Sequence, residues 1–135
     1  MIVDSSAVLA ILLGEEDAAV YAGAIGSADE CRMSAVNWLE RAIRTDLDGD
    51  PIASNAFDDF MREAGIAVEP VGFEQVQVAR GACRAYGKGT THPARLNFGD
   101  CFAYALAKLA FEPLLFKGSD FAQTDLIPAI PGENP

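Results

Sequence analysis

Residue types that build many catalytic and metal centres are scarce in this chain of 135 residues. It has one histidine, His92, and three cysteines, Cys31, Cys83 and Cys101, no two of which form a C-x-x-C pair. A zinc centre of cysteine and histidine ligands, or a site in which histidine activates a serine or cysteine, is therefore disfavoured. We expect the cysteines to be small buried apolar side chains in a reducing compartment.

The chain also lacks a long apolar segment and an excess of basic residues. The longest uncharged and mostly apolar run near the amino terminus is 5–14, which is too short to span a bilayer. The first residues carry no basic n-region, so we expect no secretion signal, no membrane association and a cytoplasmic location. Twenty acidic against ten basic residues give a net charge of −10, which argues against duplex binding through a broad basic face.

Short apolar runs alternate with longer amphipathic stretches. Runs typical of buried strands occur at 1–3, 31–33, 67–69 and 114–116, with a last one near 127–130. This alternation indicates βαβ units, hence an α/β domain with a central parallel sheet of four or five strands flanked by helices on both faces. We expect one domain over 1–130 and a frayed tail over 131–135.

Two acidic residues follow predicted strands. Asp4 ends the first apolar run, and Asp120 lies just past the run at 114–116. Functional residues of open α/β sheets collect at the carboxyl ends of strands, so these two carboxylates can be neighbours. Each also has a structural explanation, because an Asp after a strand often caps a turn or a helix.

Glu40 lies in a predicted helix over 35–47. The apolar residues of that helix recur at helical spacing and are expected to form its buried face: Val36, Leu39, Ile43 and Leu47. Glu40 lies beside this stripe, where an ionised carboxylate is costly unless it is paired or metal-bound. In the alternative interpretation, Glu40 turns to water or pairs with Arg44 one turn on.

Asp100 lies in the first turn of a predicted helix over 98–111, three residues after the expected N-cap Asn97. The helix start can direct this carboxylate into a cleft at the sheet edge. Alternatively, the carboxylate satisfies backbone N–H groups and the helix dipole. Tyr104, one turn later, can stack on a base or pack with its hydroxyl hydrogen-bonded.

The four acids carry more meaning as a set. If Asp4, Glu40, Asp100 and Asp120 meet in one cleft, four like charges cannot all remain ionised unaided. Oxygen-only ligands favour Mg²⁺ or Mn²⁺ over zinc. A cation held in this way can activate water and stabilise the leaving oxygen of a phosphodiester. The set therefore predicts metal-dependent hydrolysis, provided that the fold brings the four residues together.

Four segments, in this order, carry a resemblance to a known family. They are MIVDSSA at 1–7, MSAVNWLE at 33–40, LNFGDCFAYALA at 96–107 and LFKGSDFAQTD at 115–125. The chain resembles the PIN-domain ribonucleases over nearly its whole length. Within them it is similar to the VapC-type toxins of bacterial type II toxin–antitoxin pairs. The resemblance implies the PIN fold, a parallel sheet with the first strand central and helices on both sides.

The resemblance also implies an activity, namely Mg²⁺- or Mn²⁺-dependent endonucleolytic cleavage of RNA by metal-activated water. The implied catalytic and metal-binding residues are Asp4, Glu40, Asp100 and Asp120. Ser6 matches a hydroxyl position that supports the site, and Asp125 is a weaker candidate acid. Ser119 is a departure, since Asn is more frequent there in the family.

Partners follow from the same resemblance. It implies a VapB-type antitoxin, whose C-terminal segment lies in an apolar groove between the first helices, and a homodimer. For the RNA we expect contacts from residues 75–99, which hold four bases and no acid. These bases are Arg80, Arg84, Lys88 and Arg95. The alternative for them is a solvated helix face and loop.

Two functions of other classes stay open. One is an acid-rich α/β phosphohydrolase with Asp4 as nucleophile. The segment Asp4-Ser5-Ser6 lacks the second Asp, two residues on, that haloacid-dehalogenase-like phosphatases carry. The other is a PIN-like module that binds RNA or a partner without cutting, which the presence of all four acids disfavours.

Overall fold

The computed structural model describes residues 1–131. The strands in this part of the chain are β1 (Ile2–Val3), β2 (Cys31–Ser34), β3 (Ile66–Glu69) and β4 (Leu114–Leu115). The helices are α1 (Ser5–Leu12), α2 (Ala18–Ser27), α3 (Ala35–Leu47), α4 (Pro51–Glu63), α5 (Phe73–Tyr86) and α6 (Phe98–Ala110), followed by the 3₁₀ turn η1 (Phe121–Gln123). Strands and helices alternate as the sequence predicts.

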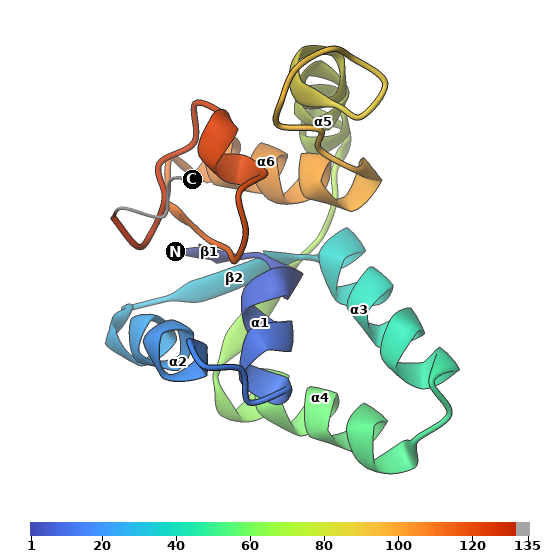
Figure 1. Cartoon of the computed structure of the whole chain (residues 1–135), viewed down its shortest axis with the longest axis vertical. Coiled ribbons are helices and arrows are strands. Elements are labelled where there is room, and N and C mark those ends of the chain that lie inside the picture. Colours follow the sequence, from blue (N-terminus) through green and yellow to red (C-terminus); the bar gives the residue numbers. More distant parts are fainter. Residues whose placement is uncertain (132–135) are drawn as a thin grey trace.

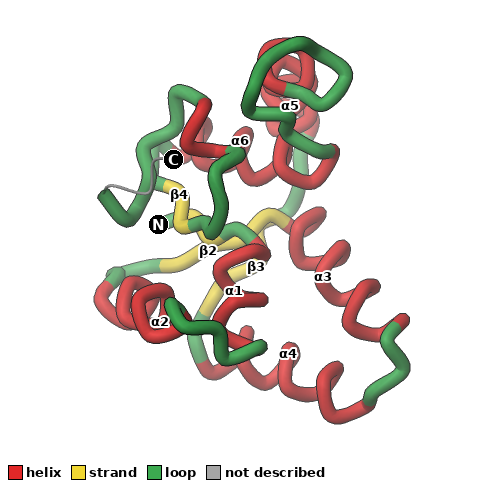
Figure 2. The backbone as a smooth tube through the Cα atoms, viewed as in Figure 1, coloured by secondary structure: helices red, strands yellow, loops and turns green. Residues whose placement is uncertain are grey.

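The strands form one parallel sheet in the order β3-β2-β1-β4 (Figure 2). Ile2 pairs with Arg32 of β2, and Val3 pairs with Leu115 of β4. The first strand is therefore flanked on both sides, and the residue that follows it, Asp4, lies at the carboxyl end of the sheet's interior. This confirms the α/β class with a parallel sheet.

The fifth predicted strand, near 127–130, is reduced to a single bridge between Pro128 and Leu114. Leu114 donates its N–H to Ile127 O at 3.0 Å and accepts from Ala129 N–H at 2.8 Å. Pro128 has no N–H, so the ladder gains nothing from its central residue. The predicted tail, 131–135, lies outside the described residues apart from Pro131.

Two apolar clusters cover the two faces of the sheet. Ile2 belongs to the cluster built with α5 and α6, and Val3 belongs to the cluster built with α1, α2 and α4. The alternation of side chains along β1 explains why neighbouring residues face opposite layers. Figure 1 shows the same layering, with α5 and α6 on one side of the sheet and α1, α2 and α4 on the other.

The helix α6 is the central helix of the fold. Eight of its thirteen residues are buried, and it begins with a capping box between Asn97 and Asp100. Five of the buried residues are small, among them Ala103 and Ala107, which lets α6 approach both α5 and the sheet closely. The burial of α6 and its capping box together fix the position of its first turn, which carries Asp100.

The helix α3 contradicts the prediction made for it. Among its residues only Asn37 is buried. Of the expected buried stripe, Val36 is half-buried and packs against the core, whereas the other three side chains are exposed, Leu39 to 51%, Ile43 to 46% and Leu47 to 80%. The helix packs by its first turns against α6 and by one side against α4, leaving these three side chains at the surface. Helical periodicity indicates an apolar face, but not what covers it.

The cysteines differ from the expectation at one position. Cys31 and Cys101 are buried, whereas Cys83 on α5 is exposed. No helix within residues 1–131 combines the length and the apolar composition that crossing a bilayer requires.

Candidate functional site

Asp4 caps α1 directly after the central strand β1. Its Oδ2 accepts the backbone N–H of Ser6 at 3.0 Å, and its own N–H donates to Leu115 O at 2.9 Å. The residue is only 4% exposed. Burial raises the pKa of Asp4, the hydrogen bonds from Ser6 and Ser5 oppose that rise, and the negative charge of Asp120 adds to it. Asp4 is thus a buried carboxylate next to another acid.

The segment that carries Asp120 is tied to α1 through Ser6. The Ser6 Oγ accepts the backbone N–H of Lys117 at 2.9 Å, which fixes the turn after β4. Asp120 is exposed at the start of η1 and makes no capping hydrogen bond there. The side chain of Lys117 is engaged elsewhere, by Glu15 and Asp17. Among residues 1–131 no ion pair engages the carboxylate of Asp120, and Ser6 holds its loop.

Asp100 serves as a cap and also faces the other acids. Its Oδ2 accepts the N–H of Asn97 at 3.0 Å, and its N–H donates to Asn97 Oδ1 at 2.9 Å. Burial, with the charges of Asp4, Asp120 and Glu40, raises the pKa of Asp100 to about 7. Asp100 therefore caps the helix, as the alternative from the sequence predicts, and in addition lies near three other negative charges.

Glu40 lies against the first turn of α6. A Cβ built on Gly99 would overlap Oε1 of Glu40, so the glycine is what admits this carboxylate. Asn37, one turn earlier, donates its Nδ2 to Gly99 O at 2.9 Å and joins the two helices. Partial burial and the charge of Asp4 raise the pKa of Glu40, while Arg44 lowers it.

The environment of Glu40 corrects two expectations from the sequence. Three of the four residues of the stripe beside Glu40 are exposed, and Glu40 is itself exposed, as in the alternative in which it turns to water. No ion pair joins Glu40 to Arg44 within residues 1–131. The carboxylate is held by its position beside Gly99 and not by a buried helix face.

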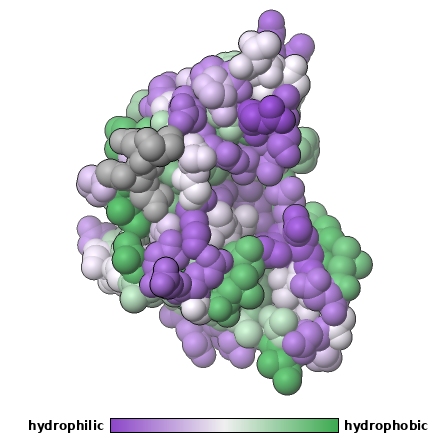
Figure 3. All heavy atoms as spheres, in the orientation of Figure 1, coloured by the Kyte–Doolittle hydropathy of each residue, from purple (hydrophilic) through white to green (hydrophobic). Residues whose placement is uncertain are grey.

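A polar cavity of about 120 Å³, here called the acidic cavity, lies where these segments meet. Its lining comprises Ser5, Asn37, Glu40, Arg41, Arg44, Asn97 and Asp100. Glu40 and Asp100, from different helices, open into the same space, and Asp4 and Asp120 are near enough for their charges to act on Asp100. The surface where α3 meets the α5–α6 pair is hydrophilic (Figure 3). The fold thus brings Glu40 and Asp100 to one cavity and leaves Asp4 and Asp120 outside its lining but within electrostatic range.

Two buried polar atoms of this cavity's lining residues lack a hydrogen-bond partner. They are Oδ1 of Asn37 and Nε of Arg41, which follow one another by one turn of α3. Burial and the charge of Arg44 lower the pKa of Arg41. Buried polar atoms without partners are uncommon in stable folds and are concentrated at functional sites.

The donor set fits a hard divalent cation. All four acids offer carboxylate oxygens, which Mg²⁺ and Mn²⁺ prefer, and a cation would offset the mutual repulsion that raises the pKa of Asp100. As placed, no three His, Cys, Asp or Glu side chains in residues 1–131 converge closely enough to ligate one ion. Asp4 and Asp100 direct oxygens at the N–H groups of Ser6 and Asn97 instead.

The basic residues nominated from the sequence lie elsewhere. Arg80, Arg84 and Lys88 are exposed on α5 and the turn after it, and Arg95 is exposed in the following loop. None of them lines the acidic cavity, whose arginines are Arg41 and Arg44. These two follow Glu40 by one and four residues, a spacing that places at least Arg44 on its side of the helix. That signal was available in the sequence, but the charge island at 75–99 was more conspicuous.

Comparison with known proteins agrees with this arrangement. The PIN domain family model matches residues 1–126. Ribonuclease VapC28 of Mycobacterium tuberculosis is 52% identical over 124 residues, 92% of this chain and 93% of the relative. The chain belongs to the PIN-domain family and, within it, to the VapC ribonucleases. Ribonuclease VapC42 of M. tuberculosis is 46% identical, covering 96% and 98% of the two chains. Ribonuclease VapC of Mycolicibacterium smegmatis is 42% identical, covering 93% and 97%.

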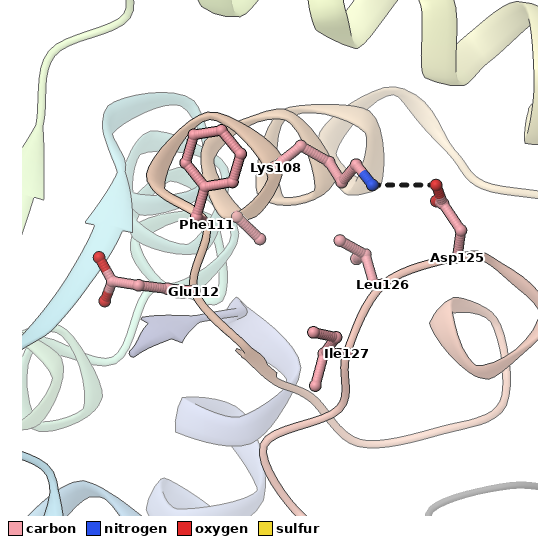
Figure 4. Close-up of a pocket in the computed structure, with 7 residues that line it drawn as sticks. Lys108, Phe111, Glu112, Asp125, Leu126 and Ile127 are labelled. Carbon is pink, nitrogen blue, oxygen red and sulfur yellow. Dashed lines mark hydrogen bonds and ion pairs between the residues drawn. The ribbon is translucent and has the colours of Figure 1, made fainter.

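A second cavity of this PIN domain, of about 180 Å³, lies at the far end of α6. Asp125 lines it and forms an ion pair with Lys108 at 2.9 Å (Figure 4). It also accepts a hydrogen bond from the Tyr104 hydroxyl at 2.7 Å. These bonds lower the pKa of Asp125. Tyr104 therefore packs with its hydroxyl bonded, and the weaker candidate Asp125 belongs to a structural contact outside the acidic cavity.

Proposed function

We propose that this PIN domain is a divalent-metal-dependent endoribonuclease and the toxin of a toxin–antitoxin pair that acts in the cytoplasm. One observation carries the proposal. Carboxylates from α3 and from the start of α6 line one polar cavity, and those after β1 and at the start of η1 are near enough for their charges to act on Asp100. Such a concentration of acids is costly in a folded chain unless a cation offsets it. The relatives named as VapC ribonucleases support the same activity.

The metal would be Mg²⁺ or Mn²⁺. Asp4 and Asp100, the two most buried of the four acids, are the proposed direct ligands, and Glu40 and Asp120 are proposed to act from the cavity rim. When bound, the cation supplies the charge that activates water and stabilises the leaving oxygen of a phosphodiester. The protein contributes the placement of its oxygens, since Ser6 fixes Asp4 and Asn97 fixes Asp100.

Glu40 is the proposed group that orients and deprotonates the attacking water. It lies at the rim of the cavity, and the glycine at position 99 leaves its carboxylate free of a neighbouring side chain. Partial burial and Asp4 raise the pKa of Glu40, which makes it a better proton acceptor than an ordinary carboxylate. Asn37 keeps α3 and α6 in register through Gly99.

RNA would be held by basic residues on two sides of the acids. Arg41 and Arg44 line the cavity itself and are the proposed contacts to the phosphate that is cut. Arg80, Arg84, Lys88 and Arg95 are proposed to contact phosphates further along the RNA. A bound cation is needed to admit a polyanion, because the uncompensated carboxylates repel it.

The proposed antitoxin of this VapC-type chain would cover the exposed apolar surface of α1 and α3. Four residues define this surface: Leu13, Leu39, Ile43 and Leu47, each at least 46% exposed. Green surface is visible in Figure 3 over the end of α1 and along α3. We propose that the C-terminal segment of a VapB-type antitoxin lies there and that the toxin forms a homodimer.

The test is an RNA cleavage assay with the purified chain. We expect cleavage in Mg²⁺ or Mn²⁺ that EDTA abolishes, and a loss of about 100-fold or more in Asp4→Asn and in Asp100→Asn. Asp125→Asn is the matched control, because this acid lies outside the cavity. Its cleavage rate should equal that of the wild type. Mapping the ends of RNA cut in cells would then define the substrate.

The same assay separates the alternatives. Phosphate release from small esters, without RNA cleavage, would favour an α/β phosphohydrolase with Asp4 as nucleophile. RNA binding that persists in Mg²⁺ without any cleavage would favour a non-cleaving PIN-like module. Cleavage that survives both EDTA and Asp4→Asn would contradict the proposed role of the acids.

A further inference from the structure

Two cysteines face one another across the α5–α6 interface. The thiol of Cys83 on α5 donates to Sγ of Cys101 on α6, and the two sulfur atoms are 2.8 Å apart. Cys83 is exposed to solvent, whereas Cys101 is completely buried. The third cysteine, Cys31, belongs to the apolar cluster on the opposite face of the sheet. An oxidant in solvent therefore meets Cys83, and the thiol beside it is Cys101.

We propose that Cys83 and Cys101 form a modification site that closes reversibly into a disulfide linking α5 to α6. A disulfide bond is about 2.05 Å long, so the sulfur atoms have to approach by about 0.8 Å from their separation of 2.8 Å. Because α5 and α6 pack directly against one another and the two sulfur atoms are already 2.8 Å apart, closure requires only a small adjustment of two helices. Disulfides in reducing compartments are usually transient and redox-sensing, which fits a pair that is reduced at rest.

The oxidant is hydrogen peroxide. The Cys83 sulfur attacks one peroxide oxygen, the O–O bond breaks, and Cys83 sulfenic acid and water form. The Cys101 sulfur then attacks the sulfenic sulfur, the S–O bond breaks with loss of a second water, and the S–S bond forms. Two thiols are oxidised and one peroxide is reduced to two waters. A thiol reductant reverses the closure by exchange at the exposed Cys83 sulfur.

Closure would act on the neighbouring carboxylate. Cys101 follows Asp100 directly, in the first turn of α6, and that turn lines the acidic cavity. Movement of the Cys101 side chain toward α5 displaces this turn, and an error of about 1 Å in a catalytic group can cost about 100-fold in rate. The effect on RNA cleavage rests on the proposed function, whereas formation of the disulfide does not.

The first test measures the disulfide itself. Purified protein is treated with a small excess of peroxide, and intact mass, free-thiol counting and peptide mapping follow. We expect the loss of two hydrogens, one remaining thiol, and a linked pair of peptides containing Cys83 and Cys101. Cys31→Ser should still close, and Cys83→Ser, at an exposed position, should not. Sulfinic acid at Cys83, a pair involving Cys31, or a disulfide between two copies would overturn the proposal.

The second test measures the consequence in the Cys31→Ser protein. RNA cleavage is compared before oxidation, after oxidation and after reduction. We expect a fall of about 10- to 100-fold on oxidation that a reductant reverses and that Cys83→Ser lacks. An oxidised protein that cuts at the reduced rate would overturn the regulatory effect. Failure of the reduced protein to cut would overturn the proposed function, while the mass measurement would still decide the disulfide.

Discussion

The helices α3 and α6 are of equal length, thirteen residues each, and each carries one acid of the cavity, yet they are built into the molecule in opposite ways. Eight residues of α6 are buried, against one of α3. In α6 five of the eight buried residues are small, whereas Leu39, Ile43 and Leu47 of α3 are exposed. The cavity therefore lies between a fixed helix and a helix with an unpartnered face.

This difference separates two uses of apolar residues. Apolar side chains on α6 hold the fold together and place Asp100, while those on α3 are available to another chain. The two helices meet near the first turn of α6, where Asn37 donates to Gly99 O and Glu40 lies over Gly99. Under the proposed function, activity depends on this meeting point, stability mainly on α6 and recognition of the antitoxin mainly on α3.

The largest difference should appear in stability. Leu106→Ala in α6, where the leucine is 6% exposed, should lower the free energy of unfolding by about 2–5 kcal/mol through loss of burial and a new cavity. Leu47→Ala in α3, where the leucine is 80% exposed, should change it by no more than about 0.5 kcal/mol. Urea unfolding measures both. Equal losses would show that the α3 stripe is buried in solution, for instance in a dimer.

The sequence predicted much of this fold because strand and helix periodicities report local chemistry. The buried first strand and the helix N-cap at Asn97 are local features, and both occur as expected. Exposure of Leu39 and Ile43 could not be predicted, since a partner surface and a core face have the same pattern. The approach of Cys83 to Cys101 depends on how α5 and α6 cross, which no local pattern encodes.

A change at the meeting point should separate activity from stability. Gly99→Ala should displace the Glu40 carboxylate and lower RNA cleavage by about 10- to 100-fold, while the protein remains folded. Gly81→Ala on α5 is the matched control, because nothing lies within 4 Å of its added Cβ. Cleavage rate and circular dichroism give the two readouts. Full activity in Gly99→Ala would remove Glu40 from the proposed machinery.

The outward face of α3 should matter only for the partner. Leu47→Ser should weaken binding of the cognate antitoxin about 10-fold, a change of about 1.4 kcal/mol, and leave RNA cleavage unaltered. Phe73→Ser is a matched control on α5, because this side chain is 74% exposed but lies on another helix. Titration calorimetry with the antitoxin provides the measurement. An equal loss in both variants, or no loss in Leu47→Ser, would contradict the proposed surface.

The smallest effect concerns pH. Burial and neighbouring charges raise the pKa of Asp100 from 3.8 to about 7, so the folded state keeps a proton that the unfolded state releases. Stability without metal should therefore fall as pH rises from about 4 to about 7. In Asp100→Asn the fall in Tm between about pH 4 and about pH 7 should be smaller by a few degrees than in the wild type. The exposed control Asp58→Asn should show the same fall as the wild type. A slope unchanged in Asp100→Asn would show that its carboxylate carries no such shift.

The most direct measurement is anomalous diffraction from crystals grown with Mn²⁺. It reports whether acids from α3, α6 and the two strand ends hold one cation site, independently of any RNA substrate. We predict a manganese peak within about 2.5 Å of oxygens from both Asp4 and Asp100, which Asp4→Asn removes. Manganese bound only elsewhere, for instance beside Asp125, in a protein that still cuts RNA in Mn²⁺, would contradict the convergence of the four acids as the basis of activity.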